Sequence, residues 1–156
     1  TLQSLQSSLY FLIFNDTHTL MSGAYLLSAD GIFLMFPFIF NMKTNTVSDF
    51  MFFRDGPEGF ASQYEITSAA GGALGFSSDD TRICGYYILA NGQNARPIVW
   101  DATTGEDKGI DFENVEFGGV AVRFSSDDNQ ICGYYYDANG FFIPIVWDAV
   151  TGNKIL

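Results

Sequence analysis

The sequence is poor in basic residues. It has seven lysines and arginines against eighteen aspartates and glutamates, which gives a net charge of −11. A chain this acidic repels phosphate backbones, so we expect no nucleic-acid partner. The anionic surface of a membrane is disfavoured for the same reason. The charge can serve solubility, or it can attract cations or a basic partner, and we favour the first interpretation.

The sequence also has no hydrophobic run long enough to cross a membrane. Its longest apolar stretch, from Ile32 to Phe40, has nine residues and contains Pro37. A membrane-spanning helix needs about twenty residues. We therefore predict no membrane insertion and assign the stretch to a buried strand.

Motifs for metal binding, cofactor binding and catalysis are missing as well. His18 is the single histidine, and the sequence has no CxxC, no HExxH, no phosphate-binding loop and no Gly-x-Gly-x-x-Gly. We accordingly predict no cofactor, no metal and no catalytic residue. An enzyme that uses a pair of carboxylates stays an alternative because acidic residues abound. No spacing in the sequence, however, brings two of them together.

Cysteine is scarce too, and its placement is regular. Cys84 and Cys132 hold equivalent positions in successive repeats, where the first repeat has Ser22. Packed sheets lie about 10 Å apart, whereas a disulfide needs Cα atoms within about 7 Å. We therefore predict two free, buried thiols.

Glycine and phenylalanine are abundant, with sixteen of each, and this mixture favours short strands over helices. The residues are organised in three copies of one pattern. The second and third copies share Phe-Ser-Ser-Asp-Asp, Ile-Cys-Gly-Tyr-Tyr and Pro-Ile-Val-Trp-Asp-Ala-x-Thr-Gly, and the first copy is degenerate but in register. The repeat signature comprises Phe14, Gly23 and Phe40 in the first copy, Phe76, Gly85 and Trp100 in the second, and Phe124, Gly133 and Trp147 in the third.

The length of the repeat indicates the fold class. A repeat near fifty residues is one small unit that must stack on its neighbours to bury its hydrophobic face. Each copy contains four strand-like segments separated by turn dipeptides such as Asn-Gly, Asp-Gly and Thr-Gly. We therefore predict an all-β fold of β-propeller blades, with three four-stranded antiparallel repeats in an open or partial propeller. A stacked solenoid or a long meander is the alternative. The predicted segments are a degenerate first blade at 1–53, an inserted inter-blade loop at 54–70, a second blade at 71–115 and a third blade at 116–156.

Alternating strand direction sorts the turns onto two faces of the repeat array. The Ser-Ser-Asp-Asp and Asp-Ala-x-Thr-Gly turns share one face, and the Asn-Gly turns share the other with the connectors between blades. The inserted loop, which contains Arg54 and Asp55, belongs to the second face. Tyr136 and Asp137 stand beside the last Asn-Gly hairpin on that face. Because loops on a rigid scaffold commonly carry binding sites, these four residues are our candidates for ligand binding.

The paired aspartates allow two interpretations. Asp79-Asp80 and Asp127-Asp128 could ligate calcium, which needs several oxygen ligands. Aspartate is also favoured in turns, where it binds its own backbone. The first copy has Thr17 and His18 at these positions, which a metal site common to all repeats would not survive. We favour turn chemistry.

The aromatic residues that end the third strands also allow two interpretations. Trp100, Trp147 and Phe40 could be platforms on which sugars stack, or they could pack between blades. Burial of one large aromatic side chain per repeat supplies much of the energy of a repeat core. We therefore favour packing.

The repeated blocks resemble the HAF-type extracellular repeats of bacteria. They also look like WD40 blades, with Phe-Ser-x-Asp before the second strand and Trp-Asp at the end of the third. The spacing from Gly133 to Trp147 is longer than a WD40 blade has, and the histidine turn of that family is missing. The resemblance is strong for residues 72–156 and weak for residues 9–50. It implies a propeller fold and a secreted or surface-exposed bacterial protein, and it supplies no catalytic residues.

Three blades do not close a propeller, because propellers typically have four to eight. We expect the further blades to come from the same longer chain or from a homo-oligomer, and we favour a fragment of a longer chain. The function that we predict is a non-catalytic scaffold at the cell surface or outside the cell that binds a protein or a glycan. The alternatives are a carbohydrate-active enzyme whose active site needs missing blades, and a structural subunit of a surface assembly.

Overall fold

The structure is a computed structural model that describes residues 6–29, 32–49, 70–88 and 94–156. These residues form ten β-strands and no helix. The strands are β1 (Gln6–Phe14), β2 (Leu20–Ala29), β3 (Ile32–Asn41), β4 (Thr46–Asp49), β5 (Ala70–Phe76), β6 (Arg82–Ile88), β7 (Arg96–Asp101), β8 (Gly119–Phe124), β9 (Gln130–Tyr136) and β10 (Phe142–Asp148). Within the described segments, no helix has the length and apolar character that crossing a membrane requires.

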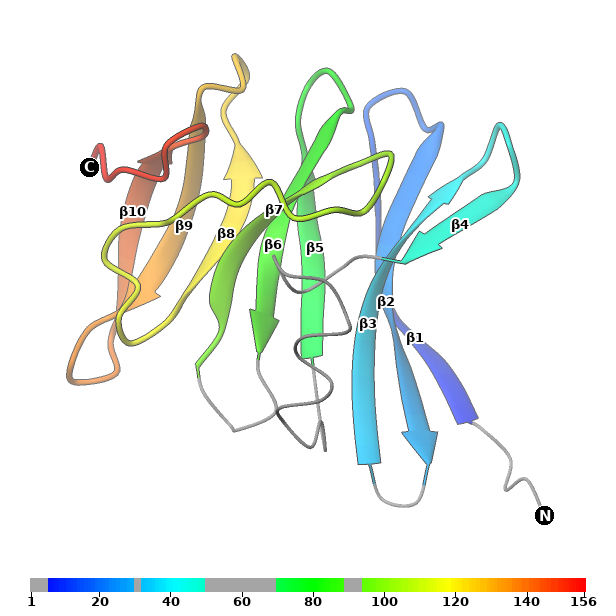
Figure 1. Cartoon of the computed structure of the whole chain (residues 1–156), viewed down its shortest axis with the longest axis horizontal. Helices are drawn as coiled ribbons and strands as arrows, with labels where there is room; N and C mark the ends of the chain where they lie inside the picture. Colours follow the sequence, from blue (N-terminus) through cyan, green and yellow to red (C-terminus); the bar gives the residue numbers. More distant parts are fainter. Residues whose placement is uncertain (1–5, 30–31, 50–69, 89–93) are drawn as a thin grey trace.

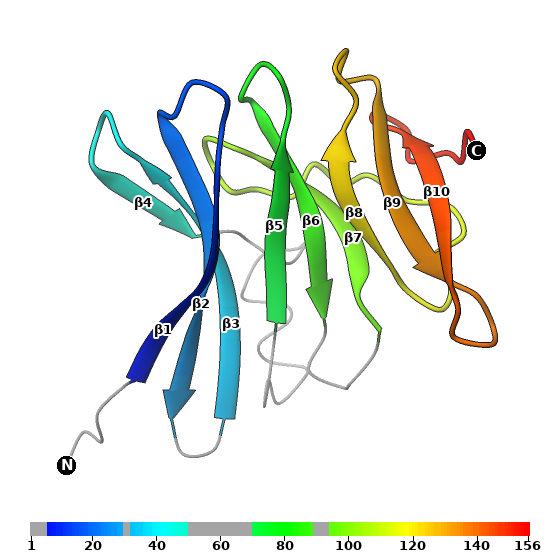
Figure 2. The same ribbon diagram turned by 180° about the vertical axis from the view of Figure 1, so that it is seen from behind.

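The strands form three antiparallel sheets that stand side by side in chain order (Figure 1). Blade 1 has the order β1-β2-β3-β4, blade 2 the order β5-β6-β7, and blade 3 the order β8-β9-β10. The view from behind shows the hairpins that open each blade, β1–β2, β5–β6 and β8–β9, at one common end of the sheets (Figure 2). The predicted all-β class is confirmed, and the described strands form three sheets, one in each predicted repeat.

The prediction of four strands per repeat holds in blade 1 alone. In blades 2 and 3 the fourth segment makes a single antiparallel bridge, between Trp100 and Asp107 and between Trp147 and Lys154. In blade 2 the reason is local, because Gly109 has φ = 67°, a left-handed conformation that turns the chain away just after the bridge. The fourth segment therefore pairs only briefly with the third strand: Lys108 N donates to the Val99 carbonyl at 2.8 Å in blade 2, and Ile155 N donates to the Val146 carbonyl at 2.8 Å in blade 3.

The hydrophobic core lies between blades, not inside them. In blade 3, Phe124, Ile131 and Trp147 are paired across the three strands and so share one face, which we call the leading face. These three side chains pack against Cys84 and Val99 of blade 2, and all five are buried. The opposite face of each blade, which carries Cys84 in blade 2 and Cys132 in blade 3, is called the trailing face. Each blade thus covers the trailing face of the one before it, as a stacked repeat requires.

Gly133 shows why the second strand of the blade carries a glycine. A Cβ atom added there would lie 2.1 Å from the Val120 carbonyl oxygen and 2.7 Å from the Trp147 ring. The glycine therefore lets the indole approach β9 closely. The equivalent Gly85 is equally confined, since an added Cβ would lie 1.9 Å from the Gly72 carbonyl oxygen.

The two cysteines are free, as predicted, but only one is buried. Cys84 is fully buried between blades 2 and 3, and this burial raises the pKa of its thiol. The prediction that Cys132 is also buried is wrong, because Cys132 is exposed. It lies on the trailing face of blade 3, where no described blade follows to cover it.

Candidate functional site

The turns after the first strands have one geometry in all three repeats. His18, Asp80 and Asp128 are equivalent and have φ values of 53°, 59° and 59°. Each donates its backbone N–H to the carbonyl three residues earlier, at 3.0–3.1 Å. The first repeat therefore keeps the turn although a histidine replaces the aspartate. Asparagine, aspartate and histidine tolerate this left-handed conformation better than most residues.

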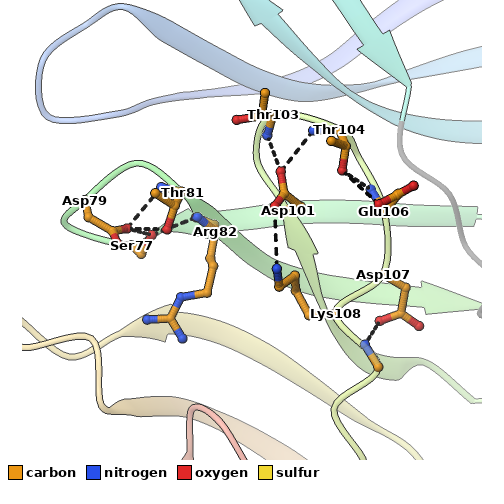
Figure 3. A network of polar contacts seen from close by, with 11 residues as sticks. Ser77, Asp79, Thr81, Arg82, Asp101, Thr103, Thr104, Glu106, Asp107 and Lys108 are labelled. Atoms are coloured by element: carbon orange, nitrogen blue, oxygen red, sulfur yellow. Dashed lines mark hydrogen bonds and ion pairs between the residues drawn. The ribbon is translucent and has the colours of Figure 1, made fainter.

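The first aspartate of each Ser-Ser-Asp-Asp motif closes its own turn. The Asp79 carboxylate accepts hydrogen bonds from Ser77 Oγ at 2.7 Å and from Thr81 N and Oγ at 3.0 and 2.7 Å (Figure 3). The Ser77 hydroxyl, followed by Thr81, lowers the pKa of Asp79 from 3.8 to about 2. Turn chemistry thus accounts for this carboxylate, as we favoured. Within the described segments, no three histidine, cysteine, aspartate or glutamate side chains are grouped to hold a metal ion.

The second aspartate of the motif joins neighbouring blades. The Asp128 carboxylate of blade 3 accepts hydrogen bonds from Ser78 in the turn of blade 2. Ser78 N donates at 2.8 and 2.9 Å to the two carboxylate oxygens, and Ser78 Oγ donates at 2.6 Å. The Asp80 carboxylate of blade 2 accepts hydrogen bonds from two side chains in the turn of blade 1, from Asn15 Nδ2 at 2.7 Å and from Thr17 Oγ1 at 3.3 Å. We call this contact the turn latch. It aligns the hairpins of successive blades at the end of the sheets that carries the Ser-Ser-Asp-Asp turns.

A groove of about 580 Å³ lies at this end, where the ends of β1, β5 and β8 come together. Its lining residues include Phe14, Phe76, Ser125, Asp16 and Arg123. The Phe14 ring is 49% exposed, so an apolar surface is offered beside polar groups. Concave sites that combine an apolar wall with a few convergent polar groups are typical of ligand pockets.

Arg123 is the cationic group of the groove. It is exposed, and within the described residues it forms no ion pair and no hydrogen bond. A β-bulge at Val122, between the pairs Ala121–Gly133 and Arg123–Cys132, sets its direction. Bulges often re-aim a side chain beside a functional site. An unpaired guanidinium in so acidic a chain is a ready partner for a carboxylate.

Sequence reasoning missed Arg123, although a signal was present. The equivalent positions in the other repeats are Ile13 and Gly75, so Arg123 is a departure from the repeat inside an otherwise apolar strand. What the sequence could not show is that three strand ends from separate repeats converge there.

Two of the predicted ligand-binding residues, Tyr136 and Asp137, do not line the groove. Arg54 and Asp55 lie outside the described residues. The ring of the half-buried Tyr136 contacts the Tyr134 ring edge-on and the Phe142 ring at a tilted angle, with ring centroids 6.0 and 5.0 Å apart. The Asp137 carboxylate accepts Asn139 N at 2.8 Å and Phe141 N at 2.9 Å, and these bonds lower the pKa of Asp137. Asp137 therefore closes its hairpin, at the end of blade 3 opposite the groove, and ligand binding there stays a prediction.

The two tryptophans are structural. Trp100 and Trp147 have no exposed surface, so neither offers a ring face to a sugar. The Trp147 Nε1 atom donates to the Glu113 carbonyl at 2.9 Å, and the Phe112 ring contacts the indole edge-on at 5.1 Å. Packing between blades is therefore confirmed, and the idea that they form sugar platforms is wrong.

Comparisons with known proteins support the fold. The chain matches no protein family model and no curated protein. It is similar to the solved structure of TolB from Acinetobacter baumannii, with a TM-score of 0.56 and 14% identity over 92% of this chain and 30% of that chain. It is similar to the β-propeller domain of the Trilobed protease from Pyrococcus furiosus, with a TM-score of 0.64 and 13% identity over 96% of this chain and 42% of that chain.

A third similar structure is a protein from Bacteroides ovatus described as a dipeptidyl aminopeptidase IV, with a TM-score of 0.60 and 12% identity over 90% of this chain and 23% of that chain. The chain therefore has a β-propeller fold. It spans 23–42% of the length of these three structures, so the three blades correspond to part of each.

Proposed function

We propose that the chain is a non-catalytic β-propeller scaffold of a secreted or surface-exposed bacterial protein, and that it binds a protein or a glycan in the groove between β1, β5 and β8. Arg123, whose side chain has no ion-pair or hydrogen-bond partner among the described residues, carries this proposal. It selects a ligand with an acidic group, such as a peptide carboxylate or a uronic acid. The exposed Phe14 ring provides an apolar contact beside it.

Asp128, whose carboxylate belongs to a residue that lines the groove, supports a binding role over a catalytic one. Asp128 accepts three hydrogen bonds from Ser78 and so fixes the turn latch. A carboxylate used in this way is a poor general acid or base, because its oxygens are already occupied by hydrogen bonds. The groove therefore offers recognition groups, and the latch holds them in place.

The test is a comparison of acidic and neutral ligands with charge-matched variants. Arrays of acidic peptides and of uronic-acid glycans, each beside its neutral counterpart, identify a binder, and calorimetry then measures its affinity. Arg123→Gln should weaken binding about tenfold or more, the size expected for loss of a charge-assisted hydrogen bond. Lys43→Gln removes the same charge from an exposed turn of blade 1 and should leave the affinity nearly unchanged.

Equal affinities for the two variants would refute the assignment of the groove. Release of reducing ends or of cleaved peptide from a bound ligand would refute the non-catalytic role.

A further inference from the structure

Most of the hydroxyl groups that line the groove are already used within the fold. Ser77 Oγ and Ser125 Oγ each donate to the first aspartate of their own turn, at 2.7 and 2.6 Å. Each also accepts the backbone N–H of the residue five positions later, at 2.9 and 3.0 Å. Ser78 and Asp128 bind each other in the turn latch. A ligand that binds through many hydroxyl groups, as a glycan does, therefore finds few free partners among the described residues.

The amide side chain that lines the groove is occupied as well. Asn15 is 2% exposed, and its Oδ1 atom accepts Thr19 N at 2.8 Å and Leu20 N at 2.9 Å. Its Nδ2 atom donates to Asp80 at 2.7 Å and to Thr17 at 2.8 Å. An amide group has one acceptor oxygen and two donor hydrogens, so Asn15 has no donor left for a ligand.

Arg123 is surrounded by apolar residues on the side of blade 2. A Cβ atom added at Gly75 would lie 2.8 Å from the backbone of β8 and 3.2 Å from the Arg123 Cα atom, so β5 and β8 are in direct contact here. Leu74 and Phe76, the sequence neighbours of Gly75, are half-buried and line the groove together with Arg123. One wall of the groove therefore combines a cation with apolar side chains.

Two carboxylates limit the negative charge that a ligand can bring into the groove. Asp16 and Asp128 line it together with the single guanidinium of Arg123, and Asp16 is exposed. Like charges at short range repel each other. A uronic-acid polymer carries a carboxylate on every sugar and is disfavoured, whereas a ligand with one carboxylate at its end is accepted.

We propose, on the basis of the groove function proposed above, that the ligand is the C-terminal end of a peptide with an apolar last residue. Its α-carboxylate pairs with the Arg123 guanidinium, a pairing that commonly forms two parallel hydrogen bonds. Its last side chain packs against Leu74 and Phe76. The α-carboxylate and the side chain are attached to the same carbon atom, so they match a wall on which a cation and apolar residues are adjacent. Capture of a terminal carboxylate is a recurring mode of peptide recognition.

The experiment uses the whole chain and an array of short peptides that carry each residue type at the last position. Every peptide is present as the free acid and as the C-terminal amide, and trigalacturonic acid is included as the glycan. Fluorescence polarisation then measures the affinity of the best peptide. Free acids that end in leucine, isoleucine or phenylalanine should bind best. Amidation should weaken binding about tenfold or more, and a terminal serine should weaken it about tenfold.

A thermodynamic cycle isolates the contact with the carboxylate. Arg123→Gln should weaken binding of the free acid about tenfold or more and leave binding of the amide unchanged, so that the difference between the two ligands disappears. Lys43→Gln, the charge-matched control in an exposed turn of blade 1, should preserve that difference.

The outcomes separate this inference from the proposed function of the groove. Equal binding of free acids and amides, or a preference for a polar last residue, overturns the peptide terminus as the ligand. Binding of trigalacturonic acid that depends on Arg123, without binding of any peptide, also overturns it but leaves the groove as a ligand site. Binding of neither class, or binding that Arg123→Gln does not change, overturns both.

Discussion

At the scale of single residues, the aspartates of the turns tie the stability of the fold to pH. The pKa of Asp79 is lowered to about 2, and the pKa values of Asp101, Asp127, Asp137 and Asp148 are lowered as well by hydrogen bonds within their turns. A lowered pKa in the folded state means that the unfolded chain binds protons first as the pH falls. For Asp79 this stabilisation is therefore present above about pH 4 and is lost as the pH falls towards 2.

The effect of one turn can be isolated. Asp79→Asn should reduce the loss of stability between pH 4 and pH 2, by less than about 1 kcal/mol because the site is screened by solvent. Urea unfolding at a series of pH values provides the measurement. Glu116→Gln, at an exposed position of the connector, is the charge-matched control. Identical pH profiles for wild type and Asp79→Asn would show that the turn contributes nothing.

Trp147 is the residue whose truncation should reduce the stability of the fold most. It is fully buried against Ile131 and Phe112 and donates to the Glu113 carbonyl. Trp147→Ala should lower the free energy of unfolding by about 3–5 kcal/mol, since a large cavity is left. Val150→Ala is the control. Because Val150 is 72% exposed, this substitution should lower the free energy of unfolding by less than about 0.5 kcal/mol. A loss below about 1 kcal/mol for Trp147→Ala, measured by urea titration, would contradict the role of the indole in the core.

At the scale of the strand, the close approach of β8, β9 and β10 depends on a glycine. Gly133→Ala forces a methyl group against the Val120 carbonyl and the Trp147 ring, where the backbone cannot move aside. We expect a loss of about 1–3 kcal/mol, as for other overpacked sites. Gly140→Ala meets no atom within 4 Å and tests only the positive φ of 80°, so it should cost about 1 kcal/mol. Thermal melts of both variants rank the two effects, and a larger loss at Gly140 would contradict the steric argument.

Local patterns predicted strands and turns well, and they failed where separate repeats meet. The Ser-Ser-Asp-Asp turns expected in the second and third copies connect β5 to β6 and β8 to β9, because turn signals act within a few positions. The exposure of Cys132 and the turn latch at Asp128 depend on what lies across a blade interface. Equivalent residues are identical in sequence there, yet their surroundings differ, so the repeat alone predicts the same burial for both cysteines.

At the scale of the whole molecule, the blades should unfold together, since each core cluster is built from two of them. Trp147 and Phe124 of blade 3 share one cluster with Cys84 of blade 2, and Trp100 of blade 2 shares another with Ile39 of blade 1. Losing one blade would expose the trailing or leading face of its neighbour, which costs apolar burial in both. Far-UV circular dichroism, tryptophan fluorescence and alkylation of Cys84 should therefore report one urea midpoint, within experimental error. Reaction of Cys84 at a clearly lower urea concentration than the loss of tryptophan signal would show that blades 2 and 3 separate first, and that each repeat is stable without its neighbour.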